Sequence, residues 1–377
     1  MKRLVLLGGG HSHIEVLRRF AADPPAHTEL VLVSPYPDLP YSGMLPGWIA
    51  GHYSRDECHV DLAALARSAN GRFVQSACRE LDLDGRRVLC ESGVSLPYDV
   101  LSMDTGGRSP ASDTSGAALH ALPVKPVEQF MPRWEDICAR AERGQAPRRV
   151  AMVGGGAAGV EVLLSMQYRL RRLAPASGTR FDLISDAGSI LPGHNRRVRS
   201  AFMRVLLQRD VTLHLGHAVR QVEDGMLRLH GGDVVLADAI VWATGASAPA
   251  WPKAAGLAVD ERGFVRVNGG LQSISHSHVF AAGDIASVEN HPRPKSGVYA
   301  VRAGPPLAMN LRRMLRGEPL VDWRPQQAAL ALISTGDRYA VASRGFLALE
   351  GRWAWRWKDR IDRRFMRRYR ILHQDPK

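Results

Sequence analysis

The length and composition of the chain predict a protein of two globular domains with a small extension. Its 377 residues are too many for one ordinary hydrophobic core, and 45% of them are hydrophobic, which is enough apolar material for two cores. No stretch approaches the roughly 18 continuous apolar residues that a transmembrane helix needs. The apolar run after Met1 is short and leads into glycines, so we expect a first strand there and not a signal peptide.

The charges and the cysteines narrow the range of partners. The formal net charge is +13, and residues 351–377 alone carry ten Arg or Lys against three Asp, a net of +7. This uneven distribution favours a local partner of the C-terminal segment. The four cysteines, Cys58, Cys78, Cys90 and Cys138, are scattered without metal-ligand spacing. We therefore expect no metal site and a cytoplasmic protein.

The first predicted element is a strand that runs into a glycine-rich turn. Residues 3–7 form a short apolar strand, a helix is expected after Gly10, and residues 30–33 form a second buried strand. This order is that of a dinucleotide-binding unit, in which glycines allow a tight turn and the helix N-terminus offers N–H groups to phosphates. We assign Gly8, Gly10 and Ser12 to cofactor binding.

Two positions of this unit depart from the usual pattern. His13 occupies the place of the third glycine, so either the helix is displaced slightly from the strand or the imidazole lies near the bound cofactor. Ser34 ends the second strand, where an acidic residue usually binds the ribose, and its hydroxyl offers an uncharged hydrogen bond instead. Both residues are assigned to the cofactor site.

A second unit repeats the first at an offset of 146 residues. Residues 149–153 form the strand, Gly154, Gly156 and Gly159 supply the turn, and residues 181–184 form the next strand. Gly154 would make the tight turn, Gly156 would let the backbone approach a pyrophosphate, and Gly159 would let the helix pack against the strand. Two copies of the motif in the same context make an ordinary strand-to-helix turn a poor explanation.

The end of the second strand in this unit leaves the choice between NAD and NADP open. Ser185 stands where an acidic residue would bind a ribose hydroxyl, and Asp186 follows it. Arg196 and Arg197 either meet a 2′-phosphate or form a solvated helix face. The cofactor assignment here includes Asp186.

Later strands complete both predicted sites. Each unit is followed by an apolar strand that ends in Thr-Gly, and a further strand over residues 278–282 ends in Gly-Asp. The positions assigned to cofactor binding at these strand ends are Thr105, Gly106, Thr244, Gly245, Gly283 and Asp284.

Over roughly residues 1–315 the order of these motifs resembles the pyridine nucleotide–disulfide oxidoreductase superfamily, flavoproteins with two dinucleotide-binding domains. The resemblance is closer to type II NADH dehydrogenases and to the oxidoreductase module fused ahead of selenide, water dikinase. The segments that carry it are residues 8–13, 41–47, 124–126, 295–302 and 355–365.

This resemblance implies an α/β fold with two Rossmann-like three-layer domains, with FAD and NAD(P)H as cofactors. The implied FAD-binding domain comprises residues 1–118 and 264–325, and the implied NAD(P)H-binding domain comprises residues 119–263. Residues 326–377 form a C-terminal extension with a basic amphipathic helix.

The resemblance also assigns roles to single residues. Asp284 would bind the ribityl chain of FAD, although a helix N-cap is the ordinary alternative. A helix starting near Ser296 and Gly297 would point its N–H groups at reduced flavin, and Lys295 would either add charge there or lie solvated. Glu161 would lie close to the nicotinamide and flavin, against the alternative of compensating charge at a helix N-terminus. Glu161 and Lys295 are the predicted catalytic residues.

The electron acceptor is left open. Type II NADH dehydrogenases carry two glutamines near the quinone, and the matching positions here are Val298 and Arg302, so that motif is not met. Sulfide-oxidising relatives use paired cysteines, whereas Cys58 beside His59 is a single thiol, either reactive or inert. We expect an FAD-dependent NAD(P)H oxidoreductase that delivers electrons to a quinone at the membrane surface. The alternatives are a soluble flavin reductase, a sulfur- or selenium-linked oxidoreductase, and a nucleotide-binding redox sensor.

The C-terminal segment predicts a helix with an apolar stripe between basic residues. Trp353, Trp357, Ile361, Phe365 and Tyr369 recur every four residues. Such a helix suits an anionic membrane surface, here the inner face of the cell membrane. Alternatively, the stripe packs on the flavin domain or on a second subunit of a homodimer. Nucleic acid is not expected, because no reader motif accompanies the basic residues.

Overall fold

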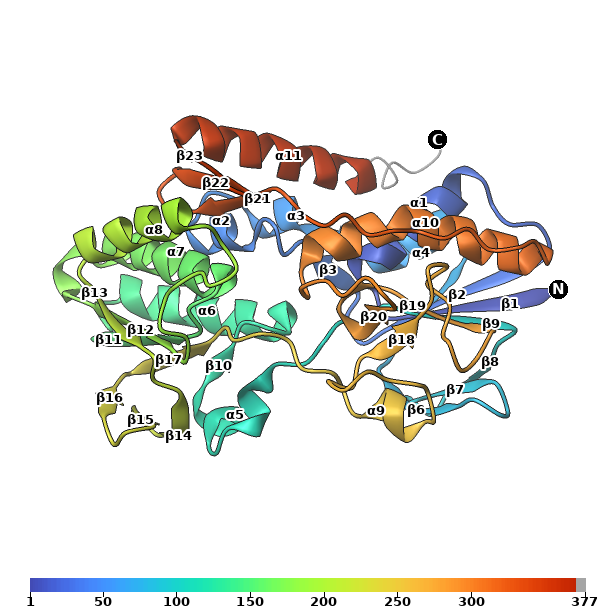
Figure 1. The fold of residues 1–377 in the computed structure, drawn as a ribbon, viewed down its shortest axis with the longest axis horizontal. Coiled ribbons are helices and arrows are strands. Elements are labelled where there is room, and N and C mark those ends of the chain that lie inside the picture. Colours follow the sequence, from blue (N-terminus) through green and yellow to red (C-terminus); the bar gives the residue numbers. More distant parts are fainter. Residues whose placement is uncertain (371–377) are drawn as a thin grey trace.

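The computed structural model of the chain describes residues 1–370, apart from the Ser112 side chain, and places two α/β halves side by side (Figure 1). The first half contains a five-stranded parallel sheet with the strand order β19-β9-β1-β2-β5. These strands are β1 (Lys2–Leu7), β2 (Thr28–Ser34), β5 (Arg72–Gln75), β9 (Val100–Met103) and β19 (Val279–Ala281).

The second half repeats this sheet. Its strand order is β10-β17-β11-β12-β13, again entirely parallel. The strand that precedes each glycine-rich turn, β1 or β11, is therefore the central strand of its sheet. The strands are β10 (Leu122–Pro123), β11 (Arg149–Val153), β12 (Arg180–Ser185), β13 (Val211–Leu215) and β17 (Ala239–Trp242). The α/β fold with two Rossmann-like halves is confirmed. The exact domain limits stay a prediction.

Helices cover the two sheets. Those of the first half are α1 (His11–Ala22), α4 (Leu62–Ser68) and α10 (Gly297–Arg316), and those of the second are α6 (Val127–Glu142), α7 (Ala157–Leu173) and α8 (Arg196–Gln208). Short helices are α2 (Leu45–Ile49), α3 (Arg55–Cys58), α5 (Ala117–His120) and α9 (Trp251–Ala254), with single 3₁₀ turns at Pro110–Asp113, Pro175–Ser177 and Gly283–Ile285. The predicted start of the helix at Gly297 is correct.

The remaining strands form small sheets. Each half has a three-stranded antiparallel sheet: β6 (Cys78–Asp82), β7 (Arg87–Cys90) and β8 (Ser95–Pro97), and β14 (Val219–Glu223), β15 (Met226–Leu229) and β16 (Val234–Leu236). Two pairs add β3 (Asp38–Pro40) to β4 (His59–Asp61), and β18 (Val265–Val267) to β20 (Ala286–Val288). A third sheet of β21 (Ala331–Ser334), β22 (Ala340–Arg344) and β23 (Leu347–Gly351) precedes the last helix.

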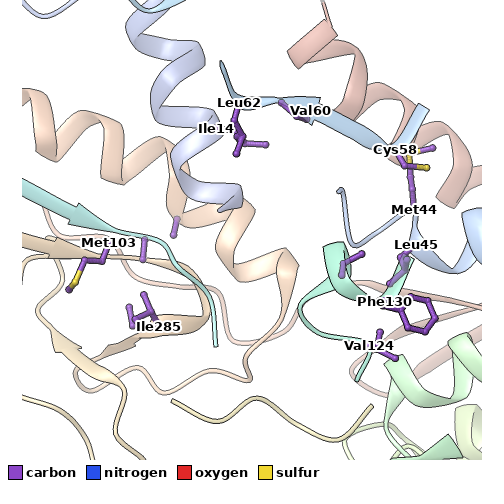
Figure 2. Close-up of a cluster of buried hydrophobic side chains, with 14 of the residues drawn as sticks. Ile14, Met44, Leu45, Cys58, Val60, Leu62, Met103, Val124, Phe130 and Ile285 are labelled. Atoms are coloured by element: carbon purple, nitrogen blue, oxygen red, sulfur yellow. The ribbon is translucent and has the colours of Figure 1, made fainter. Parts of the chain in front are cut away.

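The core is continuous between the two halves. Leu4, Val5 and Leu6 of β1 are fully buried, as expected for a parallel strand covered on both faces. Figure 2 shows part of this core, in which residues of the first sheet and α1 share one cluster with residues of the second half. The labelled members are Ile14, Met44, Leu45, Cys58, Val60, Leu62, Met103, Val124, Phe130 and Ile285.

The final helix, α11 (Arg352–Arg370), runs along one edge of the molecule over both halves (Figure 1). It packs against β21, β22, β23, β4 and α3. Its predicted apolar stripe divides between two faces: Phe365 and Tyr369 are buried, whereas Trp353, Trp357 and Ile361 are 48%, 41% and 41% exposed. The first part of the stripe therefore faces solvent and the last part packs on the rest of the protein. None of the helices within residues 1–370 is long and apolar enough to cross a bilayer.

Candidate functional site

A cavity of about 340 Å³ lies beside the first glycine-rich turn. It opens at the carboxyl ends of β1, β2 and β9, where an open parallel sheet reverses its strand order and ordinarily binds ligands. Of the residues predicted for the first cofactor, those that line this cavity are Gly8, Gly10, Ser34, Thr105, Gly106, Asp284 and Gly297.

The turn itself requires glycine. Gly8 has φ +97°, and a Cβ there would lie 2.5 Å from the carbonyl oxygen of Asp104. A Cβ on Gly10 would clash with the carboxyl group of the same Asp104. Neither position accepts a side chain, so the backbone stays open to a ligand that approaches the turn.

Ser12 and His13 do not line the cavity. The Ser12 hydroxyl donates to the carbonyl oxygen of Ala300 at 2.8 Å. The His13 ring is buried, with Nδ1 2.6 Å from the carbonyl oxygen of Gly8 and Nε2 2.8 Å from the Ser102 hydroxyl. Burial lowers the pKa of His13 to about 4, so the ring is neutral. The imidazole therefore ties α1 to the turn after β1 and to β9, and of the two alternatives for His13 the structure does not favour a ring that lies in the cavity.

In the second half, the three glycines of the turn are needed for different reasons. Gly154 has φ +125°, with a Cβ position 2.6 Å from the carbonyl oxygen of Ala243. A Cβ on Gly159 would clash with the carbonyl oxygen of Gly154, because α7 packs directly on β11 there. A Cβ on Gly156 would meet no atom within 4 Å. The fold therefore requires Gly154 and Gly159, whereas only a bound ligand would require Gly156.

The other residues predicted for this second site lie at the ends of its strands. The Asp186 side chain is exposed, and the Thr244 hydroxyl accepts a hydrogen bond from the Trp242 indole at 2.7 Å. Gly245 has open space around its Cα. The Ser185 hydroxyl accepts from the N–H of Ala187 at 3.3 Å.

Comparisons with known proteins decide the family. A family model described as pyridine nucleotide-disulphide oxidoreductase matches residues 2–304. The chain belongs to this family. Members of this oxidoreductase family bind FAD and NAD(P)H, and the prediction of both cofactors is confirmed at that level.

Individual relatives agree with this assignment. An NADH dehydrogenase-like protein of Mycobacterium tuberculosis is 26% identical over 76% of this chain and 73% of its own length. A demethylphylloquinone reductase of Synechocystis is 24% identical over 93% of this chain and 88% of its own length. The crystal structure of a sulfide:quinone oxidoreductase from Aquifex aeolicus has a TM-score of 0.81 at 18% identity, over 100% of this chain and 93% of that one, which shows a shared fold.

The residues around the first cavity fit FAD. The glycine turn leaves its backbone open, and the cavity is also lined by His11, whose buried Nε2 has no hydrogen-bond partner among the described residues. An unpartnered buried nitrogen at a cavity wall is costly unless a ligand satisfies it. The oxidoreductase chain thus offers a glycine cradle, a free imidazole nitrogen and the Asp284 carboxylate to one ligand.

Sequence reasoning missed three residues of this site: His11, Asp104 and Lys125. Lys125 pairs with Asp284 at 2.8 Å, so Asp284 is held by an ion pair and does not cap a helix. Burial lowers the pKa of His11 to about 4, with Asp284 raising it and Lys125 lowering it. Lys125 lies within a segment that carries the family resemblance, and Asp104 directly precedes Thr105. The spacing of residues in the sequence did not indicate which residues either of them would contact.

The helix α10 presents its N-terminus to the cavity through Gly297. Ser296 is its N-cap residue, without a capping hydrogen bond from the side chain, and Gly283 packs against the Asp104 carboxyl group. Lys295 lies outside the cavity lining. Its ammonium group bonds to the carbonyl oxygen of Ala286 and lies 3.8 Å from the ring centre of Phe264, and burial lowers its pKa to about 8.

Glu161 belongs to a partly buried charged cluster and does not line the first cavity. Its carboxylate accepts from the N–H of Ser334 at 2.6 Å, and burial raises its pKa to about 7 although Lys358 opposes this. Lys358 donates to Asp362 at 2.7 Å and to the carbonyl oxygen of Gly43. We call Glu161, Lys358 and Asp362 the α11 charge cluster.

Aromatic rings lie between the α11 charge cluster and the wall of the first cavity. The Tyr41 hydroxyl donates to Asp362 at 3.3 Å, and its ring stacks on Phe365 with 4.2 Å between centres. The centre of the His11 ring lies 5.6 Å from the centre of the Tyr41 ring and 6.4 Å from that of Phe365. The last helix therefore packs next to a residue that lines the predicted FAD site.

The single thiol next to His59 is inert. Cys58 is buried, and burial raises its pKa to about 12, which leaves almost no thiolate at neutral pH.

Proposed function

We propose that this oxidoreductase is an FAD-dependent NAD(P)H dehydrogenase that passes electrons to a quinone dissolved in an anionic membrane. Bound FAD would supply the chemistry, accepting a hydride from the nicotinamide and releasing electrons to the acceptor. The protein would supply position and electrostatics. Asp284 and Lys125 would hold the ribityl region, and the N-terminus of α10 at Gly297 would face negative charge on the reduced ring.

The observation that carries the membrane part of the proposal is an exposed apolar surface on the C-terminal segment. We call it the docking surface. Phe346, in the turn between β22 and β23, is 81% exposed, and the remaining apolar members are more than one third exposed. The members are Phe346, Leu347, Leu349, Trp353, Trp357 and Ile361.

Basic residues share this surface. Arg356, Arg360, Arg364 and Arg367 are exposed and follow the helical spacing of the tryptophans, so cations and indole rings lie on the same face of α11. Indole rings suit headgroup depth and arginines suit anionic lipid. Trp353 and Trp357 stack at 6.3 Å between ring centres and remain exposed together. This combination favours a bilayer over a protein partner of neutral charge.

The quinone part of the proposal is supported by position and by relatives. The buried side of α11 places Phe365 against Tyr41 and His11, beside the predicted FAD site, while the exposed tryptophans and Ile361 of the same helix belong to the docking surface. A membrane quinone would then be close to the flavin. The relative from Synechocystis, which matches 93% of this chain, is named a demethylphylloquinone reductase.

Vesicle cosedimentation tests this proposal. Replacing Arg356, Arg360, Arg364 and Arg367 with glutamine removes four charges at about 1 kcal/mol each near an anionic surface. We expect the variant to stay in the supernatant with phosphatidylglycerol vesicles, and wild type to detach at high salt. Arg363 is left in place, because it pairs with Glu57 at 2.6 Å and with Asp359 at 2.9 Å.

The matched control removes four exposed arginines from α6 and the residues after it, namely Arg133, Arg140, Arg143 and Arg148. This control changes the net charge equally and should still bind vesicles. Anaerobic bleaching of the flavin by NADH should be unchanged in both variants, whereas turnover with a lipid-dissolved quinone should fall only in the α11 variant. If wild type does not cosediment at low salt, or the two variants behave alike, the membrane part of the proposal is wrong.

A further inference from the structure

The N-terminus of α1 already holds an anion supplied by the protein. Asp104 follows β9, is 3% exposed and lines the first cavity. Its Oδ2 accepts the N–H groups of Ser12 at 2.7 Å and His13 at 3.2 Å. The first N–H groups of a helix have no hydrogen-bond partner within the helix. In dinucleotide-binding folds a pyrophosphate ordinarily binds to these groups.

Among residues 1–370 no such anion lies at the corresponding place in the second half, and this makes the arrangement specific to the first site. Ala243 is the counterpart of Asp104: a Cβ on Gly154 would lie 2.6 Å from its carbonyl oxygen, as a Cβ on Gly8 would lie 2.5 Å from that of Asp104. Ala243 has no carboxyl group with which to accept the first N–H groups of α7, as Asp104 accepts those of Ser12 and His13. One nucleotide site therefore leaves its helix start to the ligand, and the other carries a carboxyl group there.

A carboxylate at this place conflicts with a bound pyrophosphate. FAD would bring two negative charges to the same helix end, in a site where the Asp104 carboxyl group is largely out of contact with water. The neighbouring groups do not compensate. His11 and His13 are neutral, and Lys125 is paired with Asp284, whose own carboxylate also faces Asp104.

Protonation of Asp104 would remove this repulsion between the carboxylate and the pyrophosphate. Burial raises the pKa of Asp104 to about 7, the N–H groups of Ser12 and His13 lower it, and the charge of Asp284 raises it. Further negative charge would raise it again. Oδ2 accepts the two N–H groups, and Oδ1 faces Gly283. A proton can therefore reside on the carboxyl group while Oδ2 keeps both hydrogen bonds.

We propose that binding of FAD to this cavity takes up one proton from solvent at Asp104, so that the carboxyl group is neutral beside the pyrophosphate. Asp104 is thus a positioning residue that makes cofactor retention depend on pH. The inference rests on the assignment of FAD to the first cavity. It needs no oxidant or reductant, because the only reaction is protonation of a carboxylate.

The test is the pH dependence of FAD binding to apoprotein, followed by quenching of flavin fluorescence from pH 5.5 to 9. For wild type we expect the Kd to rise above pH 7, by up to about tenfold per pH unit, because binding then requires a proton. Asp104→Asn keeps an oxygen acceptor for the two N–H groups and should give a nearly flat profile. Asp284→Asn is the matched control and should weaken binding at every pH while keeping the slope.

Calorimetry on wild type provides a second measurement that needs no variant. Titrations at pH 8 in two buffers of different ionisation enthalpy should report close to one proton taken up per FAD, and Asp104→Ala, which places the residue of the second half here, should report almost none. Tight FAD binding without proton uptake, or parallel pH profiles for wild type and Asp104→Asn, would overturn this inference alone. Failure to bind FAD at any pH would overturn the cofactor assignment and the inference together.

Discussion

Replacing Lys358 with methionine should destabilise the protein strongly, and more so at high pH than at low pH. The Lys358 side chain is 13% exposed, and its ammonium group donates to Asp362, whose side chain is 6% exposed. Methionine keeps much of the side-chain volume and removes the cation. Breaking a buried ion pair from one side costs about 3–5 kcal/mol, because the remaining charge is left without compensation.

The pH dependence follows from the two carboxyl groups of the α11 charge cluster. Burial raises the pKa of Glu161 to about 7 and raises the pKa of Asp362, and Lys358 lowers both. Without Lys358 both pKa values should rise further. A raised pKa in the folded state means that ionisation disfavours folding as pH increases. The variant should therefore lose the full amount at pH 8 and less at pH 5, where Glu161 is neutral and the raised pKa of Asp362 favours its neutral form.

Thermal and urea unfolding, followed by tryptophan fluorescence at pH 5, 6.5 and 8, measure this effect. Lys253→Met, at an exposed position of α9, is the control and should change the free energy of unfolding by less than about 0.5 kcal/mol. A loss below about 1 kcal/mol for Lys358→Met at pH 8 would place the pair among ordinary surface ion pairs and refute the reasoning. So would a loss that is larger at pH 5.

Two further predictions concern the nucleotide sites. Gly156→Val should fold and retain FAD but should no longer be bleached by NADH under anaerobic conditions, because only a ligand needs the space at Gly156. Gly159→Ala should instead lower the free energy of unfolding by about 1–3 kcal/mol, since its Cβ meets the carbonyl oxygen of Gly154. Asp284→Ala should weaken FAD retention by about 1.5–3 kcal/mol through loss of a charged hydrogen-bond acceptor, measured by dialysis, and unchanged retention would contradict its assignment.

Local chemistry predicted the parts of this structure that local chemistry controls. The two glycine-rich turns, the strands before them and the start of α10 at Gly297 depend on backbone geometry within a few residues. These features were correct, and the repeat correctly predicted two Rossmann-like halves. Their shared strand order is a finding of the structure. Both small antiparallel sheets belong to that repeat and were not foreseen, because short polar strands resemble loops.

The missed residues act through partners that are distant in the chain. Asp104 bonds to Ser12 across 92 positions, and Lys125 bonds to Asp284 across 159. No spacing rule connects such pairs before the fold is known. His13 occupies the place of the third glycine, which left a position near the cofactor open. Its ring instead bonds to Gly8 and Ser102, and His11 lines the cavity.

The C-terminal helix illustrates a second limit. Spacing of four residues predicted the helix itself, but not which side would be covered. Residues 331–351 form a sheet that holds α11 against β4 and α3, and this buries Phe365 and Tyr369 while Trp353 stays outside. Glu161 likewise met an unforeseen neighbour, because Lys358 returns to it from the last helix.

The place of β19 has a consequence for how a ribosome delivers the protein. β1 ends at Leu7 and β19 begins at Val279, so at roughly 5–20 residues per second β1 waits about 15–55 s for the strand that completes its sheet. All strands of the second sheet lie between Leu122 and Trp242 and emerge earlier. We expect the second half to fold first during translation. Asp284 and Gly297, which line the proposed FAD site, are translated later still. We therefore expect flavin to bind only when the chain is nearly finished.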